Sequence, residues 1–182
     1  MEIAGITSNT PVPSGGRIVK LPSGSPSGVF IDNAMSLVDR AVPAPTHDEK
    51  RKAILAAISE CNRWGLTGVH DPGESAETIA IYEELAKAGN YSLRNYVMLS
   101  DPGEPTSSAA TDNPYIRRGP QSALYGGHLW IRAIKLYADG ALGSRGAALL
   151  APYSDDSGNV GLLVSTEEHL ELLSELAQMF SE

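Results

Sequence analysis

Helix and strand signals alternate along residues 46–182, and this alternation narrows the choice of fold more than any other feature. Thr46 and Glu49 have the spacing of a capping box, and apolar residues then recur at helical intervals up to Gly65. Strands that alternate with helices are typical of parallel sheets with crossover helices, so the sequence predicts an α/β fold. The predicted order is a helix at 46–65, a strand at 66–70, a helix at 75–89, strands at 93–99 and 129–137, and a helix from 165.

The length of the chain limits this fold further. An eight-stranded (β/α) barrel needs about 250 residues, and rarely fewer than about 200. The chain has 182 residues and can therefore hold only part of such a barrel. Periodicity alone does not separate a barrel segment from an open doubly wound sheet.

Residues 1–45 differ in composition from the rest of the chain and are rich in proline, glycine and serine. Two short apolar runs, Ile18 to Leu21 and Val29 to Ile31, lie on either side of a loop of turn-forming residues. This pattern predicts a β-hairpin, although the same composition is also found in disordered arms. We expect residues 1–45 to be a hairpin-containing insertion and residues 46–182 to form the partial barrel.

Charge and cysteine content exclude several classes of partner. The 14 basic and 22 acidic residues give a net charge of -8, which repels nucleic acid and anionic lipid. No apolar run is long enough to span a membrane, and the first residues do not resemble a secretory signal. The single cysteine, Cys61, falls on the apolar side of the first helix and is expected to be a buried, inert thiol. We therefore expect a cytoplasmic protein that binds neither nucleic acid nor membranes.

In α/β folds the active site gathers at the carboxyl ends of the strands. The side chains expected there are His70 with Asp71, Ser100 with Asp101, and the segment from Lys135 to Asp139.

Period-two alternation predicts that Lys135, Tyr137 and Asp139 share one strand face and that Ile134 and Leu136 lie on the other. A lysine that points into a barrel needs a partner or a chemical role. An ion pair with Asp139 and a catalytic or metal-binding role both remain open.

The remaining polar motifs give weaker signals. The glycine-rich segment 140–146 could cradle a phosphate together with Arg145, but it lacks the ending of a P-loop, and a tight turn is the simpler interpretation. His47 and His169 lie at the starts of predicted helices and are expected to be solvated. The stretch 100–127 shows no periodicity and is expected to be a long loop.

The segment from Ile134 to Leu149, Ile-Lys-Leu-Tyr-Ala-Asp-Gly-Ala-Leu-Gly-Ser-Arg-Gly-Ala-Ala-Leu, closely resembles the amidohydrolase superfamily. The similar branch contains N-substituted formamide deformylase and the YtcJ-like metal-dependent hydrolases. Further segments resemble the family in the same order, among them Gly15-Gly16-Arg17-Ile18 and Leu66-Thr67-Gly68-Val69-His70-Asp71. Several separated motifs in one order make this resemblance specific.

The resemblance implies a metal-dependent hydrolase on a distorted (β/α) barrel. One or two divalent ions, usually zinc, would activate a water that attacks a non-peptide, amide-like C–N bond of a small molecule. Lys135 matches the strand-end lysine that carbon dioxide can convert to a metal-binding carbamate in this superfamily. By the same positional match, His70, Asp71, Tyr137 and Asp139 would line the catalytic site.

The family's His-x-His motif and its later histidine and aspartate ligands have no counterpart in the chain. The chain therefore resembles an interior section of the catalytic domain with at most one metal ligand, and we expect it to be inactive alone. A second hypothesis is a non-catalytic α/β remnant or interaction module that self-associates into a homo-oligomer through open strand edges. A third is a phosphate-binding α/β domain that uses the loop 140–146.

Overall fold

The computed structural model describes residues 1–102 and 112–181. Contacts within the chain divide it into two compact units, of which the first joins Met1–Ala44 to Tyr137–Glu167. The second contains Pro45–Leu136 and Glu168–Glu182. The boundary between the units thus lies close to residue 45, where the composition of the sequence changes. The first unit also contains the long segment that follows the last strand of the parallel sheet. The assignment of residues 1–45 as an insertion remains a prediction.

The first unit is built on an antiparallel hairpin of β1 (Gly16–Lys20) and β2 (Pro26–Asp32), as the sequence predicts. A 3-10 turn, η1 (Asn33–Met35), and a short helix, α1 (Ser36–Asp39), follow the hairpin. The segment after residue 137 contains a second 3-10 turn, η2 (Leu142–Ser144). The small core of this unit includes Ile6, Ile18 and Ala34, all buried.

The second unit contains the predicted parallel sheet. Its strands are β3 (Gly68–Glu74), β4 (Arg94–Ser100), β6 (Leu129–Lys135) and β5 (Gln121–Ala123), and their order across the sheet is β3-β4-β6-β5. The β3–β4 and β4–β6 pairs are parallel, whereas β5 pairs with β6 in the antiparallel sense. This arrangement confirms an α/β fold with a parallel sheet.

Local signals define the starts of the two long helices that flank β3 in the sequence. Helix α2 (His47–Arg63) begins with the predicted capping box, in which the Thr46 and Glu49 side chains each bond the other's backbone N–H. Helix α3 (Ala76–Lys87) begins at Ser75, whose hydroxyl accepts from the Thr78 N–H.

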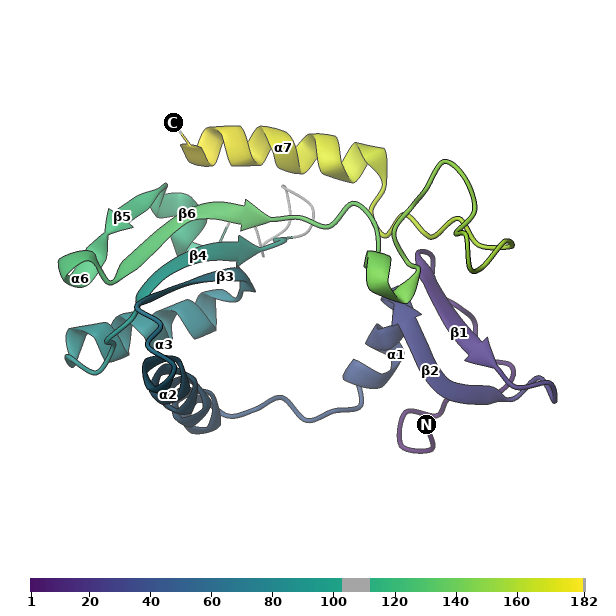
Figure 1. Ribbon diagram of the computed structural model, residues 1–182. Coiled ribbons are helices and arrows are strands. Elements are labelled where there is room, and N and C mark those ends of the chain that lie inside the picture. The colour runs from purple at the N-terminus through teal and green to yellow at the C-terminus, as the bar shows by residue number, and fades with distance from the viewer. Residues whose placement is uncertain (103–111, 182) are drawn as a thin grey trace. The chain divides into compact units, whose positions relative to one another are not determined.

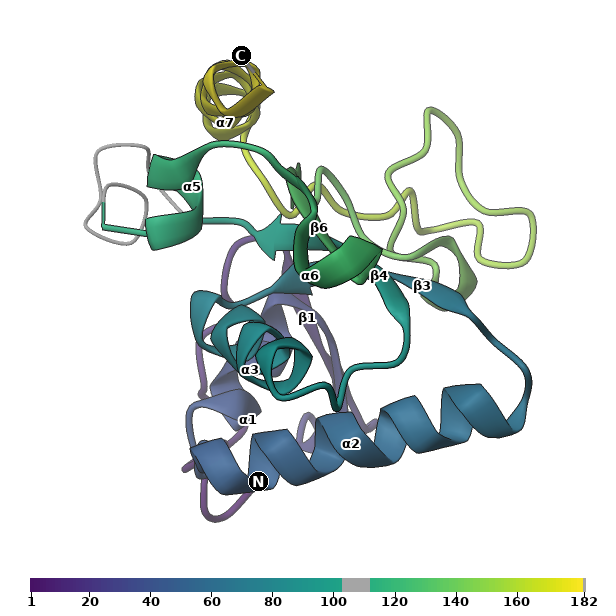
Figure 2. The ribbon, with the colours of Figure 1, turned by 90° about the vertical axis from the view of Figure 1, so that its left-hand side faces the viewer.

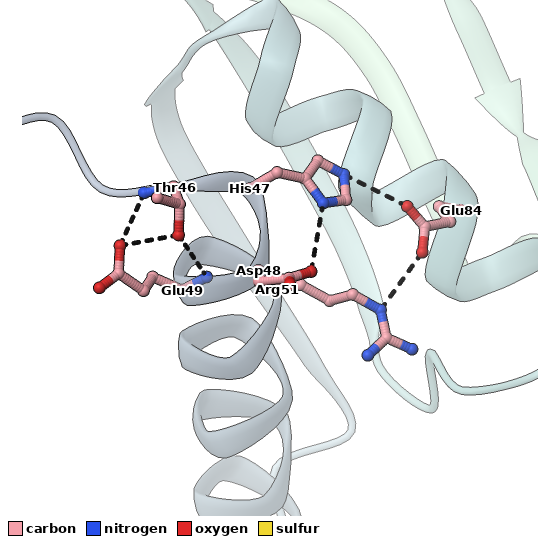
Figure 3. Close-up of polar contacts among 6 residues, drawn as sticks. All are labelled: Thr46, His47, Asp48, Glu49, Arg51 and Glu84. Atoms are coloured by element: carbon pink, nitrogen blue, oxygen red, sulfur yellow. Dashed lines mark hydrogen bonds and ion pairs between the residues drawn. The ribbon is translucent and has the colours of Figure 1, made fainter.

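Polar contacts tie the two helices together at the start of α2 (Figure 3). Glu84 of α3 accepts from Arg51 at 3.2 Å and lies 3.4 Å from the His47 ring. His47 is 53% exposed and interacts with Glu84 at the surface, so its expected solvation is confirmed in part.

Helices α2 and α3 lie on the same face of the sheet (Figures 1 and 2). The core is formed between this face and the helices, and its fully buried side chains are Ile79, Ile81 and Leu85 from α3, Val97 and Leu99 from β4, and Leu129 and Ile131 from β6. Cys61 is only half-buried, and Trp64, at the end of the predicted apolar side of α2, is 67% exposed. The expected burial of Cys61 was therefore overstated.

Short elements occupy part of the predicted loop 100–127. They are α5 (Pro114–Arg118), β5 and α6 (Leu124–Gly127), and the part of that loop at 103–111 lies outside the described residues. These elements are too short to show a period in the sequence. The last helix, α7 (Glu167–Ser181), follows the first unit's long segment. No helix in the described ranges is long and apolar enough to cross a membrane.

Candidate functional site

The parallel sheet has one face against the helices and one face away from them, which we call the open face. On β3, exposed His70 alternates with half-buried Val69 and Asp71, and Val69 packs against the core. On β4, buried Val97 and Leu99 alternate with Tyr96 and Ser100. His70 and Tyr96, which are paired across the two strands, stack their rings at 5.3 Å. These alternations place His70, Tyr96 and Ser100 on the open face.

A β-bulge in β6 sets the orientation of Lys135. Val97 pairs with Ile131 and Met98 pairs with Ala133, so Arg132 is an extra residue in β6. The bulge lets Ile131, before it, and Ile134, after it, both pack on the helix side. Lys135, next to Ile134, therefore falls on the open face.

Lys135 is the last residue of β6 and pairs with Ser100 at the carboxyl end of β4. Its side chain is half-buried, and Nζ donates to the Leu136 carbonyl at 3.2 Å. This is the end of a parallel sheet at which α/β enzymes place their chemistry.

His70 lies on the same face as Lys135 but at a different level. Its partner Tyr96 precedes Ser100, the partner of Lys135, by four residues. At about 3.3 Å per residue, these levels are about 13 Å apart along the strands. The structure therefore does not bring His70 and Lys135 together within this sheet.

Asp71 points the opposite way from His70, toward α3. Its carboxylate accepts a hydrogen bond from the Tyr82 hydroxyl at 2.5 Å, and Tyr82 is only 6% exposed. The sequence predicted that β3 would stop near Asp71, which would allow both neighbours to reach one site. The strand instead continues to Glu74, and Pro72 is tolerated because β3 is an edge strand. In this sheet Asp71 connects β3 to α3 and does not line the open face.

Glu74 lies at the carboxyl end of β3, close to Asp71. Burial, and then the negative charge of Asp71, raise the pKa of the Glu74 carboxyl above its ordinary value. Burial and the hydrogen bond to Asp71 likewise raise the pKa of Tyr82. The polar cluster beneath α3 therefore disfavours a second negative charge.

We expect Glu74→Gln to stabilise the protein near pH 7. A carboxyl whose pKa is raised on folding contributes stability that is full below its unfolded pKa of about 4.3 and is lost as the pH rises through the folded pKa. Glutamine keeps the neutral state at every pH, so the free energy of unfolding should rise by about 0.5 kcal/mol at pH 7, a value kept small by solvent screening. Urea unfolding at pH 7 and pH 4 measures this difference.

Exposed Glu171, in α7, provides the matched control for that measurement. Glu171→Gln should change the unfolding free energy little at either pH. A gain for Glu74→Gln that is equal at pH 4 and pH 7 would show that charge is not the cause.

Tyr137 and Asp139 belong to the first unit, not to the strand that carries Lys135. The prediction that the three share a strand face is wrong, because β6 ends at Lys135 although the alternation in the sequence continues. Tyr137 is 52% exposed, and its carbonyl accepts from the Ser165 hydroxyl at 2.6 Å. Asp139 accepts from the Ala148 N–H at 2.9 Å and forms a β-bridge with Leu163. Both residues thus help to fold the segment 137–167.

The loop 140–146 is organised around a carboxylate, which disfavours a phosphate site. A Cβ on Gly140 or Gly146 would lie 2.6 or 2.7 Å from the Asp32 Oδ2, so this acidic side chain sits against both glycines. Arg145, the expected phosphate ligand, donates to Asp155 at 2.5 and 3.0 Å. Its backbone N–H and that of Gly146 are bonded within the loop. The tight turn is therefore the better interpretation.

His169 has a partner that the sequence did not reveal. Its Nε2 lies 2.9 Å from the Asp101 Oδ2, and the two side chains are only 18% and 28% exposed. Asp101 directly follows β4, at the carboxyl strand end where the sequence predicts it, whereas the prediction that His169 is solvated is wrong. A separation of 68 residues left no local signal for this contact.

The described residues do not form a metal site by themselves. Within residues 1–102 and 112–181, no three His, Cys, Asp or Glu side chains are grouped so that they could hold a metal ion. Lys135 is a ligand only after its ammonium has been converted to an anionic group, and one ligand does not complete a coordination shell.

Comparison with known proteins identifies the family. The sequence profile of the Amidohydrolase family matches residues 1–181. YtcJ of Bacillus subtilis (strain 168), a protein assigned as an amidohydrolase, is 35% identical over 175 residues that cover 93% of the chain. Protein LONG AFTER FAR-RED 3 of Arabidopsis thaliana is 30% identical over 182 residues.

Solved structures support the fold. An uncharacterized metal-dependent hydrolase from Pyrococcus horikoshii matches 82% of the chain with a TM-score of 0.67 and 22% identity. One from Pyrococcus furiosus matches 99% with a TM-score of 0.65 and 19% identity. The matches cover 29% and 35% of those chains. The parallel sheet is thus a partial β/α segment of the kind found in these hydrolases.

The chain spans about a third of the length of its relatives, 31% of YtcJ and 30% of the Arabidopsis protein. The match to the family profile nonetheless extends over almost every residue, including the strand that ends at Lys135. The chain therefore belongs to the amidohydrolase family.

Proposed function

We propose that the chain is a segment of a metal-dependent hydrolase that cleaves a non-peptide, amide-like C–N bond of a small molecule. The observation that carries this proposal is the position of Lys135, half-buried on the open face at the carboxyl end of β6. Family membership supports the general reaction class, and the strand-end lysine supports the metal. A divalent ion, in our proposal zinc, would supply the Lewis acid and the activated water.

Within this proposal Lys135 binds the metal as a carbamate, which replaces the ammonium charge with two oxygen ligands. His70, on the same face but about 13 Å away along the strands, would contact substrate or support the site and would not bind the same ion. Asp71 would act indirectly through Tyr82, and Asp139 would act by folding the 137–167 segment. Within this proposal Asp71 and Asp139 therefore have positioning roles in place of the catalytic roles that the sequence predicts. The single half-buried cysteine favours a cytoplasmic location.

The test is hydrolysis of a panel of formamides, acetamides and cyclic amides by the 182-residue chain and by the longer polypeptide that extends it to the length of its relatives. We expect activity only in the longer polypeptide, loss of that activity after chelation, and its return with added zinc. Residues 1–102 and 112–181 contain no group of three His, Cys, Asp or Glu side chains that could hold a metal ion. Activity that resists complete metal removal would contradict the proposal.

A second candidate function is supported by the sheet edge. β3 is the outer strand of the sheet and presents unpaired backbone groups, so the chain alone could self-associate without any catalytic role. Size measurement by sedimentation decides between the two: a monomer at all concentrations would remove this candidate.

A further inference from the structure

Ser100, the last residue of β4, lies beside Lys135 on the neighbouring strand. The two residues are paired across the parallel β4–β6 ladder, and both side chains fall on the open face. Both are half-buried. Neighbouring strands lie about 4.8 Å apart, so a short hydroxyl side chain on one strand is within reach of the end of a lysine side chain on the other.

The part of the open face that precedes this pair is apolar. Pro72 pairs with Met98, and Met98 pairs with Ala133, two residues before Ser100 and Lys135 on their strands. The alternation along β4 places Met98 on the same face as Ser100. An anionic group on Lys135 therefore finds a hydroxyl at its side and apolar side chains behind it.

The Ser100 hydroxyl is available for a further contact. Across residues 1–102 and 112–181 it takes part in no hydrogen bond. The next residue, Asp101, is bonded to His169, whose Nε2 lies 2.9 Å from the Asp101 Oδ2. An ionised carboxylate only accepts hydrogen bonds, whereas a hydroxyl can donate one to an anion. The chemistry of Ser100 thus suits a negatively charged neighbour.

We propose that Ser100 is a positioning residue for Lys135, and that its hydroxyl donates a hydrogen bond to the carbamate of Lys135 and stabilises it. The inference rests on the proposed function, in which Lys135 carries this carbamate. The lysine ammonium first releases a proton to solvent, and the neutral Nζ then attacks the carbon of carbon dioxide. A C–N bond forms, one C=O electron pair moves onto oxygen, and a second proton leaves Nζ. The product is an anionic carbamate, and no atom is oxidised or reduced.

A hydrogen bond from Ser100 favours the carbamate over the free amine. A carbamate, like a carboxylate, has two oxygens with about four positions for acceptor contacts, so it can accept from a hydroxyl and still bind a metal. A hydrogen bond to a charged group stabilises more than one between neutral groups. Without the hydroxyl, a higher concentration of bicarbonate should be needed to keep Lys135 modified.

Titration with ¹³C-labelled bicarbonate at fixed pH tests the inference. The longer polypeptide is freed of carbon dioxide and metal and is then titrated in the presence of zinc. The carbamate resonance reports the fraction of Lys135 that is modified, and this measurement does not depend on hydrolysis. In Ser100→Ala the bicarbonate concentration that modifies half of Lys135 should rise about tenfold or more, as expected for the loss of a hydrogen bond to a charged group. Ser100→Thr keeps the hydroxyl and should restore most of the wild-type value.

Tyr96→Phe is the matched control, because it removes a hydroxyl from the same face of the same strand, four residues before Ser100. It should leave the half-modification concentration unchanged. If Ser100→Ala does not fold, Ser100→Cys, which keeps only a weak donor, should show an increase in the same direction. Half-modification of Ser100→Ala at the wild-type bicarbonate concentration would overturn this inference and leave the proposed function standing. A wild-type polypeptide without any carbamate resonance would instead overturn both.

Discussion

Lys135→Ala is expected to reduce hydrolysis by the longer polypeptide at least about 100-fold. Removal of a partner that only supports a metal ligand costs about 10–100-fold in affinity or activity, and removal of a ligand should cost more. Lys135 ends β6, and its side chain is half-buried at the carboxyl end of this inner strand, so alanine leaves a space without disturbing the core. Metal content and hydrolysis rate, measured on the same sample, should fall together.

Two comparisons separate this role from a structural one. Lys52→Ala, on the exposed side of α2, makes the same lysine-to-alanine substitution away from the sheet and should leave the rate unchanged. Adding a short carboxylic acid such as propionate to Lys135→Ala should restore part of the rate, because it supplies the two oxygens that the carbamate would provide. Full activity and full metal content in Lys135→Ala would contradict the assignment of Lys135 as a ligand.

The carbamate itself can be observed. With ¹³C-labelled bicarbonate, the metal-loaded longer polypeptide should acquire a carbamate resonance that Lys135→Ala lacks. The 182-residue chain should show none, since a lysine carbamate is labile without a metal. A stable carbamate on the 182-residue chain would show that neighbouring groups, and not a metal, hold it.

Gly161→Ala is expected to unfold the segment 137–167. Gly161 has a φ of +80°, and a Cβ there would lie 1.9 Å from the Ala147 carbonyl oxygen. The clash is with backbone, which no side-chain rotation relieves. The segments around Ala147 and Gly161 are hydrogen-bonded to each other, and this pairing requires the close contact between the two residues. The Leu162 N–H donates to the Gly146 carbonyl at 2.8 Å, and the Leu149 N–H donates to the Val160 carbonyl at 2.8 Å. The combined strain should exceed about 3 kcal/mol.

Hydrogen exchange measured by mass spectrometry shows where the effect is felt. In Gly161→Ala the amides of Leu149 and Leu162 should lose protection, whereas those of Val97 and Ile131, in the core of the other unit, should keep it. Gly158→Ala is the matched control, because a Cβ there meets nothing within 4 Å. Unchanged protection in Gly161→Ala would show that the backbone around Ala147 can move aside at little cost.

The sequence predicted the elements whose ends carry a local signal. Thr46 with Glu49, and Ser75 with its helix, mark their positions through side-chain bonds to nearby backbone groups, and both helices start as predicted. The α/β order and the hairpin followed from similar local patterns. The short elements at 114–127 did not, because a four-residue helix has no period to detect.

The candidate site was harder to predict because it depends on pairing between distant segments. Alternation from Lys135 to Asp139 continues in the sequence, but the pairing of β6 with β4 stops at Lys135. The orientation of Asp71 depends on Tyr82 in the following helix, and the partner of His169 lies 68 residues away. The sequence therefore predicts which polar side chains lie near the strand ends, but it does not predict where these side chains point or which residues they contact.

The extra residue in β6, Arg132, changes which residues of the strand face the helices. Before Arg132, the odd-numbered residues Leu129 and Ile131 build the core, and after it the even-numbered Ile134 takes over that task. If β6 alternated regularly through Arg132, without the bulge, Ile134 and Lys135 would exchange orientations. The register of β6 relative to β4, and not only the residue type at position 135, thus decides whether this lysine lies on the open face of the sheet.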